Sequence, residues 1–148
     1  MNFVSVRLIT ADFERLVAFY EQATGQPLTR YTAAFAELRL PGATLAIGHT
    51  STLAPFGGAH VASAAANRSA IIEFHVADVD AAYQRLADFL GAAVVQPPTT
   101  MPWATARCYF ATPTATWSTS SRQLPQQPFS GLRGKHRLLA LKAHWPLA

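Results

Sequence analysis

Hydrophobic and polar residues alternate along the first segment of the chain. Up to Leu8 every second residue is apolar, and Ser5 and Arg7 stand between these residues. This period of two predicts a half-buried strand. A helix should follow, because Asp12 is a good N-cap residue and Gly25 suits the left-handed position that ends a helix. The apolar residues between them recur at helical spacing: Phe13, Leu16, Val17 and Tyr20.

A β-hairpin is predicted over residues 34–47. Alternation returns in residues 34–40, and Pro41 and Gly42 suit the two central positions of a type II turn. This two-residue turn would pair Leu40 with Ala43, Arg39 with Thr44, Leu38 with Leu45 and Glu37 with Ala46. Residues 51–69 are rich in Ala, Gly and Ser, which predicts a linker loop.

The order of strand and helix then recurs in the second half. Residues 70–76 alternate as a strand, Asp78 or Asp80 can cap a helix, and Gly91 can end it. We therefore predict an α+β fold of two βαβββ modules. The boundaries are 1–50 for the first module, 51–69 for the linker, 70–121 for the second module with a doubtful last strand, and 122–148 for an irregular basic tail.

Strand pleating assigns the side chains to two faces. Val4, Val6 and Leu8 of the first strand should pack on the helices, as should Ile72 and Phe74 of the second half. The opposite faces carry the residues that we take as candidate ligand-binding residues: Arg7, Phe35, Glu37, Arg39, Glu73 and His75. Trp103 is a further candidate. Glu73 and His75 are also the candidate catalytic acid and base.

Charge is unevenly distributed. All eight acidic residues precede residue 89, whereas residues 104–148 carry six basic residues and no acidic one. The basic segment shows no nucleic-acid recognition motif, so we expect no nucleic-acid partner. No apolar run is long enough to span a membrane, and Cys108 is the only cysteine. We expect a cytoplasmic protein with no membrane partner. A nucleotide-binding loop or a nucleophile elbow is also absent.

The chain resembles the glyoxalase/bleomycin-resistance/dioxygenase (vicinal oxygen chelate) superfamily. The likeness lies in "VRLITADFERLVAFYEQATG", "FAELRLPGATLAIG" and "AIIEFHVADVDAAYQRLADFLGA", and covers roughly residues 3–103. It implies curved mixed sheets with the helices outside and a concave ligand cavity inside. It also implies a homodimer. The metal-ligand positions of the family fall on Ser5, Ala46 and Ile71, none of which can bind a divalent cation usefully.

Three functions remain open. The first is a metal-independent protein that binds a small molecule and needs no cofactor. The second is a lyase, isomerase or dioxygenase-like enzyme of the same superfamily. The third is a non-catalytic structural protein or a damaged paralogue. The charges on the polar faces have two interpretations: Arg7 or Arg39 forms a structural ion pair with Glu37 or Glu73, or these side chains recognise a polar ligand.

The end of the second module departs from the family pattern. Members of the family usually carry an Asp-Pro-Asp-Gly-Asn turn before the last strand, and it is missing here. Codons that encode residues 111–121, read two bases later, can encode this turn. We hypothesise that one base was lost near the codon of Trp103, in the gene or in its sequencing. Resequencing the locus tests this hypothesis. In the restored frame the fourth ligand position would be Asn, so the metal-free interpretation is unchanged.

Overall fold

The computed structural model describes residues 1–67, 69–102, 105–113 and 117–123, with the backbone alone at 105 and 117–123. Trp103 and the tail from residue 124 onward lie outside the described residues. The first half contains, in chain order, β1 (Ser5–Thr10), α1 (Phe13–Thr24), β2 (Thr29–Thr32), β3 (Phe35–Arg39) and β4 (Thr44–His49). After the 3-10 helices η1 (Thr50–Phe56) and η2 (Gly58–His60), the second half contains β5 (Ile71–His75), α2 (Val79–Leu90), the 3-10 helix η3 (Gly91–Ala93), β6 (Val94–Thr100), β7 (Thr105–Ala111) and β8 (Trp117–Gln123).

The strands form two four-stranded sheets. Sheet A has the order β1-β4-β3-β2, and sheet B has the order β5-β8-β7-β6. Strand β1 pairs in parallel with β4, and β5 pairs in parallel with β8. The other strand pairs are antiparallel. The sheets are therefore mixed, and the predicted α+β class is confirmed.

The predicted hairpin is confirmed residue by residue. Arg39 pairs with Thr44, Leu38 with Leu45 and Glu37 with Ala46. The amide of Leu40 donates to the carbonyl of Ala43 at 3.2 Å, which closes the turn. A two-residue turn permits no other register, so the sequence of the turn determines which side chains share a face.

Both helices begin at the predicted caps. Asp12 Oδ1 accepts a hydrogen bond from the amide of Arg15, and Asp78 Oδ1 accepts one from the amide of Ala81. Of the two alternatives for the second helix, Asp78 rather than Asp80 is the cap. Gly25 follows α1 with φ of 69°, a conformation that glycine adopts without steric cost.

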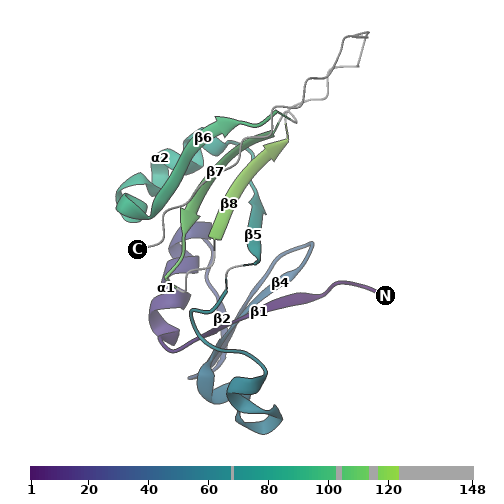
Figure 1. Cartoon of the computed structure of the whole chain (residues 1–148). Coiled ribbons are helices and arrows are strands. Elements are labelled where there is room, and N and C mark those ends of the chain that lie inside the picture. The colour runs from purple at the N-terminus through teal and green to yellow at the C-terminus, as the bar shows by residue number, and fades with distance from the viewer. Residues whose placement is uncertain (68, 103–104, 114–116, 124–148) are drawn as a thin grey trace.

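One hydrophobic core joins the two halves. Figure 1 shows α1 between sheet A and the unit of α2 with sheet B. The core contains buried residues from α1, from sheet A, from α2 and from β7. Phe19 of α1 lies at the junction, with its ring centroid 5.5 Å from that of Phe89 and 6.1 Å from that of Phe110. Arg85 of α2 also donates to the carbonyls of Gln22 and Ala23 at the end of α1.

Three segments differ from the expectation. Within the predicted linker 51–69 the chain forms η1 and η2, because the His49 side chain caps the first turn and Leu53 is buried. The doubtful last strand is formed as β8, which extends to residue 123. Val4, just before β1, and Val6 on β1 are exposed, whereas Leu8 packs on the core, since the buried core residues of sheet A lie on β3 and β4. In the part of the chain that the structure describes, no helix is long and apolar enough to cross a membrane.

Replacing Phe19 by Ala should destabilise the whole fold. Phe19 is 8% exposed and contacts both halves, so its truncation should cost about 3–5 kcal/mol. Phe56→Ala is the matched control, because Phe56 is 49% exposed and its truncation should cost below about 1 kcal/mol. Urea unfolding followed by circular dichroism measures both. Equal losses in the two variants would contradict a core that joins the halves.

Tyr20 should make the protein sensitive to alkali. Its side chain is buried, and burial raises the pKa of its hydroxyl well above the ordinary 10.0, while Thr112 lowers it by less. In the unfolded chain the hydroxyl ionises near its ordinary pKa, so the stability that this group contributes is complete below that pH and declines above it. Between about pH 8 and about pH 11, the wild type should lose roughly 1 kcal/mol more of its unfolding free energy than Tyr20→Phe. Tyr83→Phe is the control for urea unfolding at both pH values, and the same pH dependence in both variants would count against the assignment.

Candidate functional site

The register of sheet A places its polar residues on one face. Arg7 of β1 lies beside Ala46 of β4, which in turn lies beside Glu37 of β3. Residues two positions away on the same strands share this face, so Arg39 joins it from β3. The opposite face carries Leu38, Leu45 and Ile47, which pack in the core. The face with Arg7, Glu37 and Arg39 is the one that sequence alternation predicted to be polar.

Side chains on this face form a continuous series of contacts. The guanidinium carbon of Arg7 lies 4.9 Å from the ring centroid of Phe35, and the Phe35 ring lies 6.1 Å from that of Tyr31. The guanidinium carbon of Arg39 lies 5.6 Å from the Tyr31 ring, and its Nε donates to Glu37 Oε2 at 3.0 Å. We call these five residues, Arg7, Tyr31, Phe35, Glu37 and Arg39, the sheet A cluster.

The sheet A cluster carries a net positive charge. Glu37 balances Arg39, and the hydrogen bond to Glu37 is the main reason that the pKa of Arg39 lies above its ordinary value. Within the described residues, Arg7 forms no ion pair, and its contact with the Phe35 ring is cation–π. The cluster therefore contains one cation without a compensating carboxylate.

These residues do not fit a divalent metal. At the positions that the family resemblance implies for metal ligands, Ser5, Ala46 and Ile71 offer no imidazole, carboxylate or thiolate. The one carboxylate beside Ala46, that of Glu37, is already held by Arg39, and the cationic side chain of Arg7 lies on the other side of Ala46. Within the described residues, no three His, Cys, Asp or Glu side chains gather where they could hold a metal ion.

A second polar group lies on sheet B. Glu73 of β5 forms an ion pair with Arg107 of β7, and Nη1 of Arg107 also lies 3.5 Å from the Tyr109 hydroxyl. The hydrogen bond with Tyr109, followed by the charge of Glu73, raises the pKa of Arg107. His75 lies on the same face of β5 as Glu73, two residues along the strand. We call Glu73, His75, Arg107 and Tyr109 the sheet B cluster.

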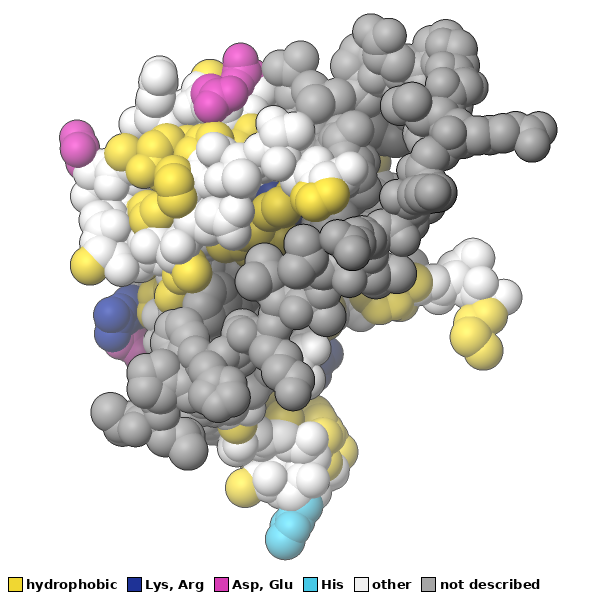
Figure 2. All heavy atoms as spheres, turned by 45° about the horizontal axis from the view of Figure 1, so that its top comes forward, with side chains coloured by type: hydrophobic (Ala, Val, Ile, Leu, Met, Phe, Trp, Pro, Cys, Tyr) yellow, Lys and Arg dark blue, Asp and Glu magenta, His cyan; other side chains and the backbone are white. Residues whose placement is uncertain are grey.

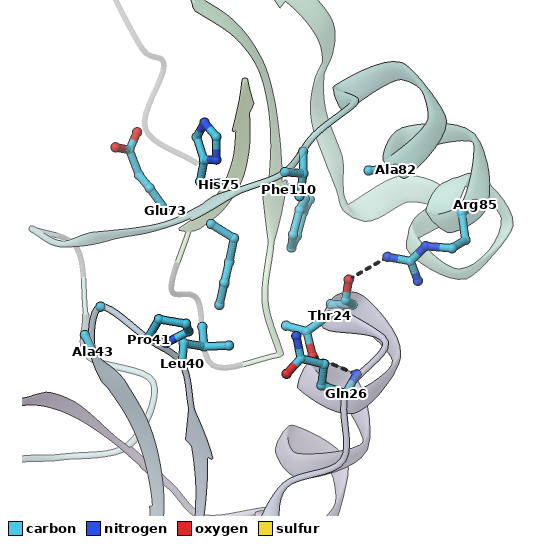
Figure 3. Close-up of a pocket in the computed structure, with 14 residues that line it drawn as sticks. Thr24, Gln26, Leu40, Pro41, Ala43, Glu73, His75, Ala82, Arg85 and Phe110 are labelled. Atoms are coloured by element: carbon cyan, nitrogen blue, oxygen red, sulfur yellow. Dashed lines mark hydrogen bonds between the residues drawn. The ribbon is translucent and has the colours of Figure 1, made fainter. Parts of the chain in front are cut away.

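Glu73 and His75 also line a cavity between the two halves. The cavity has a volume of about 540 Å³, and the hairpin turn of sheet A, the end of α1, β5 and α2 enclose it. In Figure 3 the side chains of Glu73 and His75 both point to the side of β5 opposite Leu40, while Phe110 and Thr24 border the other side. The lining is mostly apolar and contains no residue of the sheet A cluster.

The structure brings some predicted site residues together and separates others. Arg7, Phe35, Glu37 and Arg39 form one cluster, whereas Glu73 and His75 belong to the other. Of the ion pairs that the sequence left open, Arg39 with Glu37 is formed, while Glu73 pairs with Arg107.

Sequence reasoning missed Tyr31, Arg107 and Tyr109. Tyr31 lies on β2, a four-residue strand that was not predicted. Its neighbour Arg30 lies on the opposite side of the strand and pairs with Glu14. Arg107 and Tyr109 alternate with the buried Cys108 and Phe110 on β7. That alternation was the available signal, and it places both polar side chains on the same face as Glu73.

Apolar side chains are exposed at the N-terminal end of β1. Phe3 and Val4 are 72% and 69% exposed, and Figure 2 shows hydrophobic side chains on the projecting segment at the right of the molecule, where Figure 1 places the N-terminus. Together with Val6, Ile71 and Ile72, Phe3 lines an apolar groove of about 270 Å³ between β1 and β5.

Comparison with solved structures agrees with the fold. A glyoxalase/bleomycin resistance protein/dioxygenase from Nocardioides superimposes with a TM-score of 0.70 at 24% identity, covering 89% of each chain. A family enzyme from Burkholderia phytofirmans PsJN gives a TM-score of 0.70 at 16% identity, covering 84% of this chain and 100% of that one. A lactoylglutathione lyase from Agrobacterium tumefaciens gives a TM-score of 0.64 at 14% identity, covering 81% and 92%.

At these identities the structural likeness concerns the fold alone. Among curated proteins, none matches this chain. The sequence model of one family matches residues 2–117, which is most of the chain. The protein therefore belongs to the Glyoxalase/Bleomycin resistance protein/Dioxygenase superfamily.

Proposed function

We propose that the protein binds a small organic molecule at the sheet A cluster, without a divalent metal. The observation that carries this proposal is the series of two guanidinium groups and two aromatic rings on one face of sheet A. The Tyr31 ring is 49% exposed and the Phe35 ring half-buried beside Arg7, and tyrosine and arginine side chains are enriched in binding sites. The residues at the family's ligand positions support a site that works without a metal.

An enzymatic role receives less support. A lyase or isomerase mechanism would use Glu73 and His75 as acid and base, with Arg7 as a further candidate, at a polarised carbonyl. The carboxylate of Glu73 is held in an ion pair with Arg107. The ring of His75 makes no contact within the described residues that would orient it. A dioxygenase-like reaction would need a metal that the residues at the family positions do not fit. Binding is therefore the function that the side chains favour.

A melting-temperature screen against small organic acids, bases and neutral compounds tests this proposal. A compound that binds only the folded protein raises the melting temperature by mass action. We expect the shift to persist in excess EDTA and to be lost in Phe35→Ala, which removes the central ring of the sheet A cluster. Phe56→Ala is the control, because Phe56 is exposed on η1 outside the cluster. Shifts that need added Zn²⁺ or Mn²⁺, or a library without any hit, would contradict the proposal.

We further propose that the protein forms a homodimer through β1 and β5. Among the described residues these two strands are the outer strands of their sheets, and an unpaired strand edge beside exposed apolar residues favours association. Phe3, Val4 and Ile71 are each more than half exposed, and the groove between β1 and β5 is continuous with them. A second copy of the chain would bury these side chains.

A charge on the edge of β1 should break the dimer. Val6→Lys places an ammonium group at the proposed interface. In light scattering the wild type should have a mass of twice 16.0 kDa, and this variant a mass of about 16.0 kDa. Val95→Lys is the matched control, because Val95 is a similarly exposed valine on β6, the outer strand at the other end of sheet B. A wild type that is monomeric at tens of micromolar would refute the proposed dimer.

A further inference from the structure

We propose that the ligand of the sheet A cluster is a planar aromatic anion of the carboxylate class. In this arrangement its ring stacks on Tyr31 and Phe35, and its charged group is bound by the guanidinium of Arg7. The inference rests on the proposed function, since it names the class of molecule that the same site would take.

Arg7 is the residue that selects for negative charge. Among the arginines of the two clusters, Arg39 is balanced by Glu37 and Arg107 by Glu73. Arg30 lies on the other face of sheet A and is also balanced, because its Nη1 lies 2.8 Å from each carboxylate oxygen of Glu14. Arg7 contacts an aromatic ring instead, so its charge remains available to an anion.

The side chain of Arg7 is held in place before any ligand arrives. Its guanidinium stacks on Phe35, and its stem crosses Gly48, where an added Cβ would lie 3.7 Å from Arg7 Cδ. The same Cβ would lie 2.9 Å from Thr52 Oγ1, so the space above Gly48 is already filled by these side chains. The N–H groups of a guanidinium that point away from such a ring can bind a carboxylate with two hydrogen bonds. Fixing it in advance lowers the entropic cost of binding.

The aromatic residues indicate a flat ligand. Tyr31 is 49% exposed, and its ring makes an angle of 42° with that of Phe35. The central strand β4 carries small residues on this face, Thr44, Ala46 and Gly48, and the side chain of Arg7 crosses β4 at Gly48 to reach the Phe35 ring. A planar ring can therefore stack on the exposed Tyr31 ring, beside Phe35 and within reach of Arg7. A cationic ligand would be repelled by the net charge of the cluster.

Three naphthalene probes separate charge from shape. They are 2-naphthoate, 2-naphthol and 2-naphthylmethylammonium, which are anionic, neutral and cationic at neutral pH. Titration calorimetry on the wild type should give the highest affinity for 2-naphthoate, roughly tenfold or more above 2-naphthol, and the lowest for the cation. The advantage of 2-naphthoate should shrink as salt is raised, since salt screens a partly exposed ion pair.

Substitutions of Arg7 test whether this residue binds the anionic group of the ligand. Arg7→Gln should lower the affinity for 2-naphthoate about tenfold while leaving that for 2-naphthol unchanged, and Arg7→Lys should restore part of the loss. Arg30→Gln is the matched control, since it removes an arginine from the same sheet that faces away from the cluster, and it should bind as the wild type does. Melting curves of the four proteins establish that each is folded.

The inference and the proposed function fail in different ways. Equal affinities for the three probes, or the same loss in Arg7→Gln and Arg30→Gln, would overturn the anionic class and leave a binding protein. Hits in the compound screen that depend on Phe35 but include no aromatic acid would do the same. If the compound screen gives no hit and none of the three naphthalene probes binds, both the anionic class and the proposed binding function are overturned.

Discussion

The register of the hairpin between β3 and β4 is the constraint on which the site depends. Pro41 and Gly42 form a two-residue turn, and Arg39 therefore pairs with Thr44. Since side chains alternate between faces, a slip of one residue would turn Glu37 and Arg39 into the core and Leu38 toward solvent. The burial of Leu38, Leu45 and Ile47 under α1 holds the register in place. The core and the sheet A cluster are thus two faces of one pairing.

Ion pairs neutralise some of the carboxylates within the described residues. Glu37 and Glu73 each pair with an arginine of their own sheet, and Glu14 of α1 pairs with Arg30 of β2. Exposed pairs of this kind contribute little to stability, typically below about 1 kcal/mol. Their main effect is on recognition, because they leave the positive charge of Arg7 unbalanced on a face that also carries two aromatic rings.

The two halves resemble each other in order but differ in chemistry. In each half the outer strand pairs in parallel with the last strand, and an aspartate caps the helix. Phe19 and Arg85 connect the halves through α1 and α2, by ring contacts and by hydrogen bonds to the end of α1. At the positions that the family resemblance implies for metal ligands, this chain has a hydroxyl, a methyl and an aliphatic side chain. Beside one of these positions, Ala46, sheet A carries the Arg7 cation and the Phe35 ring.

Local patterns in the sequence were enough to determine much of the fold. The caps Asp12 and Asp78, the end of α1 at Gly25 and the hairpin around Pro41 depend on neighbouring residues, so each could be predicted from a short segment. The same alternation predicted that Arg7, Phe35, Glu37 and Arg39 would share a face. The family followed from the order of these segments along the chain.

The partners of individual side chains were decided by tertiary structure. Glu73 pairs with Arg107, which lies far along the chain, and no local pattern specifies a contact across three strands. Tyr31 joins the sheet A cluster because β2 forms at the edge of the sheet, although its sequence is too short and polar to predict a strand. Val4 and Val6 alternate as core residues do, yet they are exposed because α1 packs over β4 and not over the start of β1. Sequence determines which face a side chain takes, while the packing of distant elements decides what that face meets.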